Sequence, residues 1–496
     1  MNIEQDKIQQ CMNELHFEQA LALLHSIPAD QRTMTDFYRQ GLCLCALYDW
    51  KQARQAFEQA LKRCTDPQDR SEILLRLAYF YVQTNQLPQA ANAMDQALPD
   101  LPEKKQPEAY FYQALLAYEN GHVDQALKYA LQVLQYKSDE FIKIRCEAAT
   151  LAGDQWSVLG NLSKAVEAYH QALRLADGYP PNWKDLRKAL IYNNLADIYE
   201  QFEAYEQARK AYQNAWKAMD QVSDTKISDL DGYRLELYCS MANFFALNDQ
   251  FEDCDRVLEQ ARPLAKSMKM PLKLYWESRV DYIGGLSELY RENPLVQPFE
   301  KLFEAWKLQT RFLQFSPASS TEYLGKIAYY AAYCYDPKLA EGVSQEELYR
   351  QALDLFRACA FKDPSFYRFS IASIENELGT LERNQDPHKA LEDYRQALHD
   401  FQTIVNAHPD DSEALLSICA VILNLLSVLP EELIKSEGVS LLDQLDQTLT
   451  RLGRDPEHQE AFEDALDRLM ELDRLHEQLP AVIETLYSRH TAMPIS

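Results

Sequence analysis

The 496-residue sequence has little of what breaks helices, with only 13 glycines along its whole length. So low a glycine content argues against a fold that needs many tight turns between strands. Hydrophobic residues make up 47% of the chain, which is enough for a continuous apolar core. The composition therefore favours an all-α protein, either as several domains or as one extended solenoid.

Positive charge is also scarce, because 50 Lys and Arg stand against 76 Asp and Glu, for a net charge of −26. Binding to phosphate backbones needs a positive surface, so this balance argues against a nucleic-acid partner. Two interpretations of the acidic surface stay open. It attracts a basic partner, or it serves only to keep the protein in solution.

Targeting and redox features are missing as well. No two cysteines form a CxxC pair, which favours free thiols in a reducing compartment over disulfides or zinc. The first residues, MNIEQDKIQQ, have neither a basic start nor an apolar core, and no apolar run is long enough to span a membrane. We expect a soluble, cytoplasmic protein without membrane insertion. The ten scattered cysteines are Cys11, Cys43, Cys45, Cys64, Cys146, Cys239, Cys254, Cys334, Cys359 and Cys419.

The short motifs that carry catalysis are absent too. The sequence contains no GxGxxG, GxxxxGK[ST], HExxH or GxSxG, and no two histidines stand four residues apart. Asp229–Gly232 imitates the middle of a calcium loop, but Ile227 and Tyr238 occupy positions that need oxygen ligands. The chain is predicted not to be an enzyme, with no catalytic residue, metal or cofactor.

What the sequence does contain is a recurring pair of helices, clearest in Ile191–Trp216. Residues three, four and seven apart share one face of a helix, and small and aromatic residues follow this spacing on both sides of Ala208. A linker of about five residues between the two faces permits only an antiparallel helical hairpin. The residues of the pattern are Ala196, Tyr199, Ala208, Tyr212 and Ala215.

This pattern resembles the tetratricopeptide repeat (TPR) family, whose spaced small and aromatic positions map onto Leu195 and the five residues above. The resemblance implies a right-handed superhelical solenoid of antiparallel helix pairs. Inter-anchor spacings of 33, 37, 36, 39, 43 and 46 residues compare with a family period of about 34. Equivalent anchor positions are Ala20, Ala53, Ala90, Ala126, Ala165, Ala208 and Cys254.

The repeat pattern divides the chain into four predicted parts. Residues 1–268 hold seven TPR-like repeats, and 269–318 form a degenerate helical junction. Residues 319–408 hold a second set of TPR-like helix pairs. Residues 409–496 are predicted to be acidic capping helices, since 14 acidic residues stand against 5 basic ones in Glu431–Glu477.

By the same resemblance, the first helix of each repeat lines a concave groove that binds a peptide or a partner protein. Asparagine suits such a groove because its amide both donates to and accepts from an extended backbone. Tyrosine adds a rigid apolar ring with a polar tip. The expected binding residues are Tyr38, Arg39, Arg76, Tyr79, Tyr112, Tyr118, Asp154, Asn193, Asn194, Asp197 and Asn243.

One subclass of the family binds acidic C-terminal tails through asparagines and basic residues on neighbouring repeats. Asn194 and Asn243 fit that arrangement, but the residues at its lysine positions carry no positive charge. An acidic tail is therefore disfavoured there, while Arg39 and Arg76 leave a smaller anionic site open. The three lysine positions hold Thr150, Asn193 and Cys239.

Two functions follow from the resemblance. The first is a non-enzymatic scaffold or adaptor that holds a peptide segment or partner protein in the groove. The alternative is a regulatory sensor whose superhelix changes shape when a peptide binds. Partner identity, oligomeric state and the continuity of the two arrays are not specified by the sequence.

Overall fold

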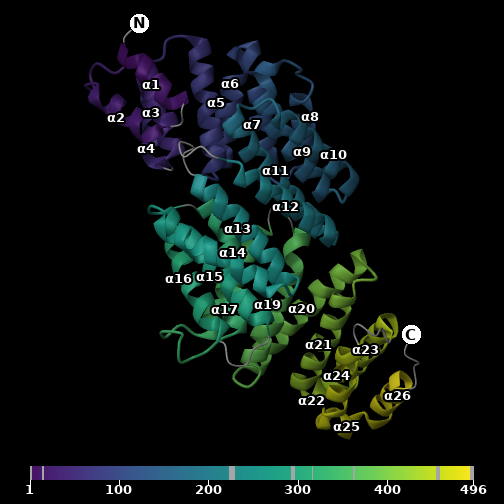
Figure 1. The fold of residues 1–496 in the computed structure, drawn as a ribbon. Coiled ribbons are helices and arrows are strands. Elements are labelled where there is room, and N and C mark those ends of the chain that lie inside the picture. Colours follow the sequence, from purple (N-terminus) through teal and green to yellow (C-terminus); the bar gives the residue numbers. More distant parts are fainter. Residues whose placement is uncertain are drawn as a thin grey trace. The chain divides into compact units, whose positions relative to one another are not determined.

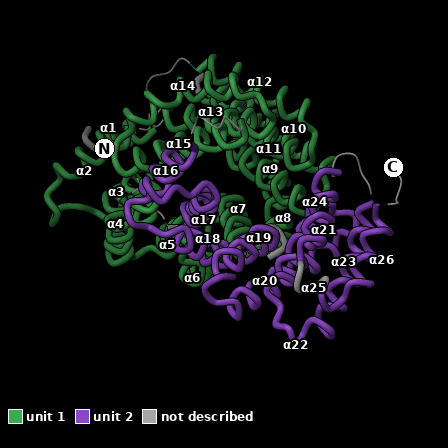
Figure 2. The backbone as a smooth tube through the Cα atoms, turned by 90° about the horizontal axis from the view of Figure 1, so that it is seen from below, with its two compact units in different colours: residues 1–296, 308–318 green, residues 297–307, 319–496 purple. Residues whose placement is uncertain are grey.

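A computed structural model describes residues 3–13, 16–47, 49–222, 230–291, 297–315, 317–360, 364–453 and 459–491. All regular elements among these residues are helices, so the predicted all-α solenoid is confirmed (Figure 1). The chain forms two compact units, residues 1–296 with 308–318 and residues 297–307 with 319–496 (Figure 2). The predicted four-part division by repeat content stays a prediction.

Unit 1 consists of seven consecutive helix pairs followed by α15 (Leu272–Tyr290) and the end of α16 (Pro298–Leu313). Short 3₁₀ turns, η1 to η3, cover Leu98–Asp100, Glu103–Lys105 and Asp139–Phe141. The pairs are α1 (Ile3–Asn13) with α2 (Phe17–Ser26), α3 (Met34–Ala46) with α4 (Trp50–Arg63), α5 (Pro67–Gln83) with α6 (Leu87–Ala97), α7 (Gln106–Glu119) with α8 (Val123–Val133), α9 (Ile142–Val158) with α10 (Leu162–Ala176), α11 (Pro181–Gln201) with α12 (Tyr205–Asp220), and α13 (Leu230–Leu247) with α14 (Phe251–Ser267).

The seven anchor residues from Ala20 to Cys254 all lie in the second helix of a pair, and each is fully buried. Small side chains at these positions allow the two helices of a pair to approach closely. On the first helices, an added Cβ atom would lie 2.6 Å from the ring of Phe57 at Gly41 and 2.6 Å from the ring of Tyr169 at Gly153. The small and aromatic positions of the sequence pattern are thus the contact between the paired helices.

Five of the turns between the paired helices of unit 1 contain a residue with a left-handed backbone conformation. Gly121 and Gly160 have φ angles of +72° and +70°, and Asn85, Glu203 and Asp249 adopt φ of +55° to +57° in their own repeats. This left-handed conformation closes a helix and suits glycine, whereas a side chain there is disfavoured by about 1–2 kcal/mol. Three of the five turns therefore carry a local strain that the repeat packing overcomes.

We expect Glu203→Gly to stabilise unit 1 by roughly 0.5–1 kcal/mol, since it relieves the left-handed backbone at an exposed turn. Urea unfolding followed by circular dichroism measures the change. The matched control is Glu167→Gly at an exposed position inside α10, which should destabilise by about 1 kcal/mol because glycine is a poor helix former. Equal destabilisation by both substitutions would contradict this account of the turn.

Unit 2 continues the same packing in its first part. Its helix pairs are α17 (Pro317–Tyr333) with α18 (Gln345–Cys359) and α19 (Pro364–Glu382) with α20 (Pro387–Ala407). A Cβ atom on Gly379 would lie 2.7 Å from the ring of Tyr394, which reproduces the contact of Gly153 with Tyr169. The helices that follow are α21 (Ser412–Val428), α22 (Glu431–Leu433), the π-helical turn η4 (Ile434–Gly438), α23 (Val439–Leu452), α24 (Gln459–Met470), α25 (Asp473–Gln478) and α26 (Pro480–Thr491).

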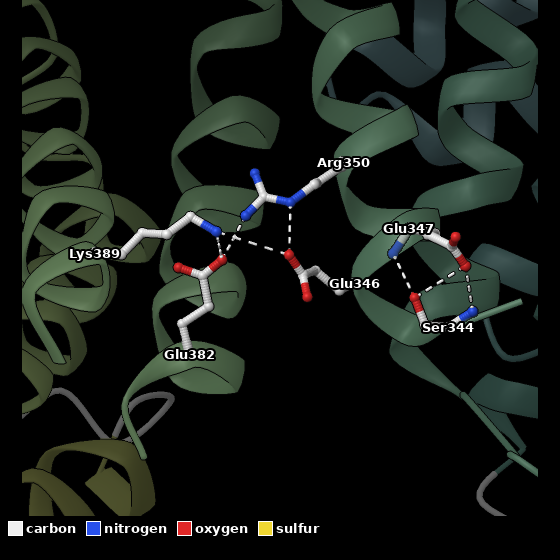
Figure 3. A network of polar contacts seen from close by, with 6 residues as sticks. All are labelled: Ser344, Glu346, Glu347, Arg350, Glu382 and Lys389. Carbon is white, nitrogen blue, oxygen red and sulfur yellow. Dashed lines mark hydrogen bonds and ion pairs between the residues drawn. The ribbon is translucent and has the colours of Figure 1, made fainter. Parts of the chain in front are cut away.

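Charged side chains tie α18, α19 and α20 together (Figure 3). The carboxylate of Glu382, only 6% exposed, forms ion pairs with both Arg350 and Lys389. Arg350 Nε also lies 2.8 Å from Glu346 Oε1. At the start of α18, Ser344 and Glu347 cap the helix reciprocally. Glu382 is thus a buried acidic group of unit 2 that is paired with cations from two neighbouring helices.

Two further predictions concern the whole chain. All ten cysteines are free, as the spacing predicted, and burial raises the pKa of Cys43 and Cys45 to about 12. These thiols are therefore poor nucleophiles at neutral pH. Among the described helices, none is both long and apolar enough to cross a membrane.

Candidate interaction surface on the first helices of the repeats

The expected binding residues lie on the first helices of the pairs in unit 1, from α3 to α13. Figure 2 shows α9, α11 and α13 on the inner side of the curved tube, with α10, α12 and α14 on its outer side. We call the surface formed by α3, α5, α7, α9, α11 and α13 the first-helix face. The structure gathers most of the expected residues on this face into two clusters.

The first cluster joins α3, α5 and α7 around Arg76. Arg76 Nη2 lies 2.5 Å from Glu108 Oε1, and its Nε donates to the hydroxyl of Tyr38 at 3.3 Å. Arg76 also donates to Tyr112, whose ring stacks on Tyr79 with centroids 4.8 Å apart. The charge of Arg76 is therefore already matched by Glu108, which leaves it poorly suited to binding a second anion.

Arg39 and Tyr118 lie outside this cluster. Arg39 donates to the Gln5 side chain at 2.5 Å and borders a cavity of about 690 Å³ beside α1. In the same cavity, Asp36 accepts hydrogen bonds from Thr33, which is the N-terminal cap residue of α3. Tyr118, at the end of α7, is 45% exposed. The structure thus separates Arg39 from Arg76, which the sequence had grouped as one anionic site.

The second cluster lies on α9, α11 and α13 and is rich in carboxylates. Asp154 and Asp197 each follow the small residue of their repeat, Gly153 and Ala196, and point to a tyrosine on the second helix. Tyr169 donates to Asp154, and Tyr212 donates to Asp197 at 2.7 Å and to Glu200. The helix contact thereby fixes where these carboxylates lie. We call Glu147, Asp154, Asp197, Glu200 and Glu236 the carboxylate cluster.

Burial changes the acidity of this cluster. It raises the pKa of Asp154 to about 7, that of Asp197 to about 6 and that of Glu200 to about 7. In each case the tyrosine hydrogen bond opposes the rise without cancelling it. Burial also raises the pKa of Glu236, although Arg279 and Arg187 act against it. Asp154, Asp197 and Glu200 therefore exchange protons closer to neutral pH than ordinary surface carboxylates do.

The three expected asparagines differ in exposure. Asn193 is 3% exposed, and its Nδ2 lies 3.4 Å from Ser240 Oγ on α13. Asn194 is half-buried and lowers the pKa of Tyr169 through a side-chain hydrogen bond, against the larger effect of burial. Asn243 is also half-buried and occupies the position equivalent to Asp154 and Asp197. Asn194 and Asn243 are therefore better placed for an incoming ligand than Asn193.

Sequence reasoning missed several members of this surface. Glu236 and Arg187 belong to the carboxylate cluster region, and Glu108 completes the cluster around Arg76. One signal was available, because the tyrosines that bind Asp154 and Asp197 both stand 15 residues after the aspartate. In the described part of the chain, no group of three or more His, Cys, Asp or Glu is arranged to hold a metal ion. The calcium-like stretch begins at Asp229, outside the described residues.

Comparison with known families decides what these repeats are. Two models of the tetratricopeptide repeat match the sequence, over residues 44–117 and 158–223. The chain is a tetratricopeptide-repeat protein. The second match begins at the end of α9 and runs through α10, α11 and α12, so it contains Asn194 and Asp197. TPRs are in general non-catalytic interaction modules, so the chain is an interaction scaffold in this broad sense.

Several solved structures are similar to this chain at low sequence identity. A Rap protein in complex with Competence and Sporulation Factor is 13% identical and aligns with 76% of this chain and 98% of its own, with a TM-score of 0.45. A human IFIT1 dimer with m7Gppp-AAAA is 13% identical and covers 94% of this chain and 95% of its own, with a TM-score of 0.43. The C-terminal part of a TPR repeat-containing protein from Cytophaga hutchinsonii is 13% identical, covering 53% and 96%, with a TM-score of 0.32. A search of curated proteins gives no significant match.

Asp154→Asn is expected to change how stability depends on pH. The folded pKa of about 7 exceeds the ordinary 3.8, so the folded state holds a proton that the unfolded state has lost between about pH 4 and pH 7. Ionisation therefore lowers stability as pH rises through this window. At pH 8 the asparagine variant should be more stable by on the order of 1–2 kcal/mol, and below about pH 4 the two should be equal.

Urea unfolding at pH 4, 6 and 8 measures this effect. Asp220→Asn, at an exposed position of α12, is the control and should shift stability equally at every pH. A stability difference between Asp154→Asn and the native chain that does not grow with pH would contradict the assigned burial.

Proposed function

We propose that the protein is a non-enzymatic scaffold that holds an extended segment of a partner protein on the first-helix face of unit 1. The observation that supports this is a row of polar side chains, one per repeat, at the position after the small residue. Asp154, Asp197 and Asn243 form the row on α9, α11 and α13. All three are half-buried, so each keeps part of its surface for a ligand.

The spacing of this row suits an extended chain. Packed helices lie about 8–10 Å apart, and an extended strand rises about 3.3 Å per residue. One polar side chain per repeat therefore meets roughly every third residue of a bound segment. Asn194 beside the row adds an amide that donates to and accepts from a peptide backbone.

Two related expectations stay predictions. A sensor that changes shape on peptide binding would use the same surface, and no separate feature of either unit favours it. The acidic balance argues against a nucleic-acid partner, but a TPR fold alone does not exclude one.

Selection from a phage-displayed library of random 12-residue peptides tests the proposal. Peptides that bind the full chain should lose at least tenfold in affinity for the double variant Asn194→Ala with Asn243→Ala. Both positions are half-buried on one face, so truncation should remove hydrogen bonds to the peptide with little effect on the melting temperature.

The control is Asn92→Ala with Gln213→Ala, at exposed positions of the second helices α6 and α12. It should bind the selected peptides as the native chain does. Equal affinity of the native chain and the Asn194→Ala, Asn243→Ala variant would show that the peptides bind elsewhere. Failure to enrich any peptide would also count against the proposal.

A further inference from the structure

The carboxylate cluster has more negative charge than its own surroundings neutralise. Two arginines lie near the five carboxylates, and both are engaged. Arg187 Nη2 pairs with Glu147 at 2.6 Å. Arg279 donates to the hydroxyl of Tyr275 at 3.0 Å and lies over the rings of Tyr275 and Trp276.

Asp154, Asp197 and Glu236 are left without an ion pair. Within the described ranges, no lysine, arginine or histidine nitrogen comes within 4 Å of any of these three carboxylates. All three are only half-exposed, and an ionised carboxylate in such a place is costly unless a cation matches it. The chain pairs Glu147 with its own arginine and leaves the three neighbours without a direct ion pair.

A buried amide oxygen at the same place also lacks a partner. Asn193 is 3% exposed, and its Oδ1 accepts no hydrogen bond. Asn193 lies one turn before Asp197 on α11, and its Nδ2 reaches Ser240, which lies one turn after Glu236 on α13. The amide therefore lies between the two carboxylates. An unpaired acceptor there is unfavourable, and a donor brought by a ligand would relieve it.

We infer that Asp197, Glu236 and Asn193, with Asp154 beside them, bind a lysine or arginine side chain of the partner segment. This inference rests on the proposed function and names the chemistry of the partner, which is a basic peptide. An ammonium has three donors and no acceptor, and the site presents two carboxylates and one amide oxygen. A guanidinium fits the same acceptors through its planar fork.

Binding of a cation should change the protonation of these carboxylates. A bound cation favours the ionised carboxylates and lowers their pKa values, so peptide binding should release protons near pH 6 and tighten as pH rises from 5 to 8. The groups that face Asp197 and Glu236 from the surrounding helices all enter this balance. They are Asp154 on α9, Tyr169 on α10, Arg187 and Glu200 on α11, Tyr212 on α12, Cys239 on α13 and Arg279 on α15.

The test uses peptides selected from the random 12-residue library on the full chain at pH 7.5. Selected peptides should carry an excess of Lys and Arg over Asp and Glu. Titration calorimetry should show at least a tenfold loss of affinity for Asp197→Asn with Glu236→Gln. The matched control, Glu206→Gln with Asp220→Asn at exposed positions of α12, should stay within twofold of the native chain.

Calorimetry at pH 6 in two buffers of different ionisation enthalpy counts the released protons. Release should fall in the Asp197→Asn, Glu236→Gln variant, and circular dichroism melting checks that this variant is folded. Should it unfold, Asp154→Asn alone serves, with a smaller loss of affinity expected.

Two failures are distinguishable. Neutral or acidic peptides that still depend on Asn194 and Asn243 would overturn the cationic ligand and leave the proposed function intact. Peptides indifferent to Asn194 and Asn243 would overturn the proposed function itself. A third result would overturn the site. If basic peptides bind the native chain and the Asp197→Asn, Glu236→Gln variant with equal affinity and release no protons, they are attracted by net charge alone.

Discussion

The close approach of the two helices in each repeat is the contact on which the rest of the structure depends. In several repeats a small residue on the first helix faces an aromatic ring on the second, as Gly41 faces Phe57 and Gly153 faces Tyr169. The ring occupies the space that a side chain would fill, and both partners are buried. Because a close-packed interior tolerates neither a void nor an added methyl group at low cost, this pair fixes the spacing of the helices. Unit 2 uses the same contact between Gly379 and Tyr394.

The same contact places the polar groups of the first-helix face. When the ring is tyrosine, its hydroxyl extends past the small residue and reaches the side chain that follows it. Asp154 and Asp197 are held in this way by Tyr169 and Tyr212. A carboxylate so held is rigid and partly shielded from water, which raises its pKa and strengthens its attraction for a cation. The packing of the two helices therefore determines where these carboxylates lie on the surface and how acidic they are.

Much of the fold follows from sequence spacing alone, because the packing contact is local. The two members of each pair stand about 16 residues apart, and the left-handed turn between their helices is marked by Gly121 and Gly160 in two repeats. The surface is harder to predict. The pairing of Arg76 with Glu108 spans 32 positions and joins different repeats, so its register depends on how repeats stack. Because the spacing of the repeats varies from 33 to 46 residues, this register cannot be predicted from the sequence.

Buried carboxylates of this chain are handled in two different ways. In unit 2, Glu375 lies 2.7 Å from Arg357, and Glu382 pairs with Arg350 and Lys389 (Figure 3). There the chain supplies the cations itself, and the ion pairs join neighbouring helices. On the first-helix face of unit 1, Asp197 instead has a tyrosine hydroxyl and an adjacent unpaired amide oxygen. A hydroxyl shares a proton but brings no positive charge, so the negative field of Asp197 and Glu236 persists at the surface. The difference between Glu382 and Asp197 is the difference between a carboxylate that holds helices together and one that we propose is available to a basic ligand.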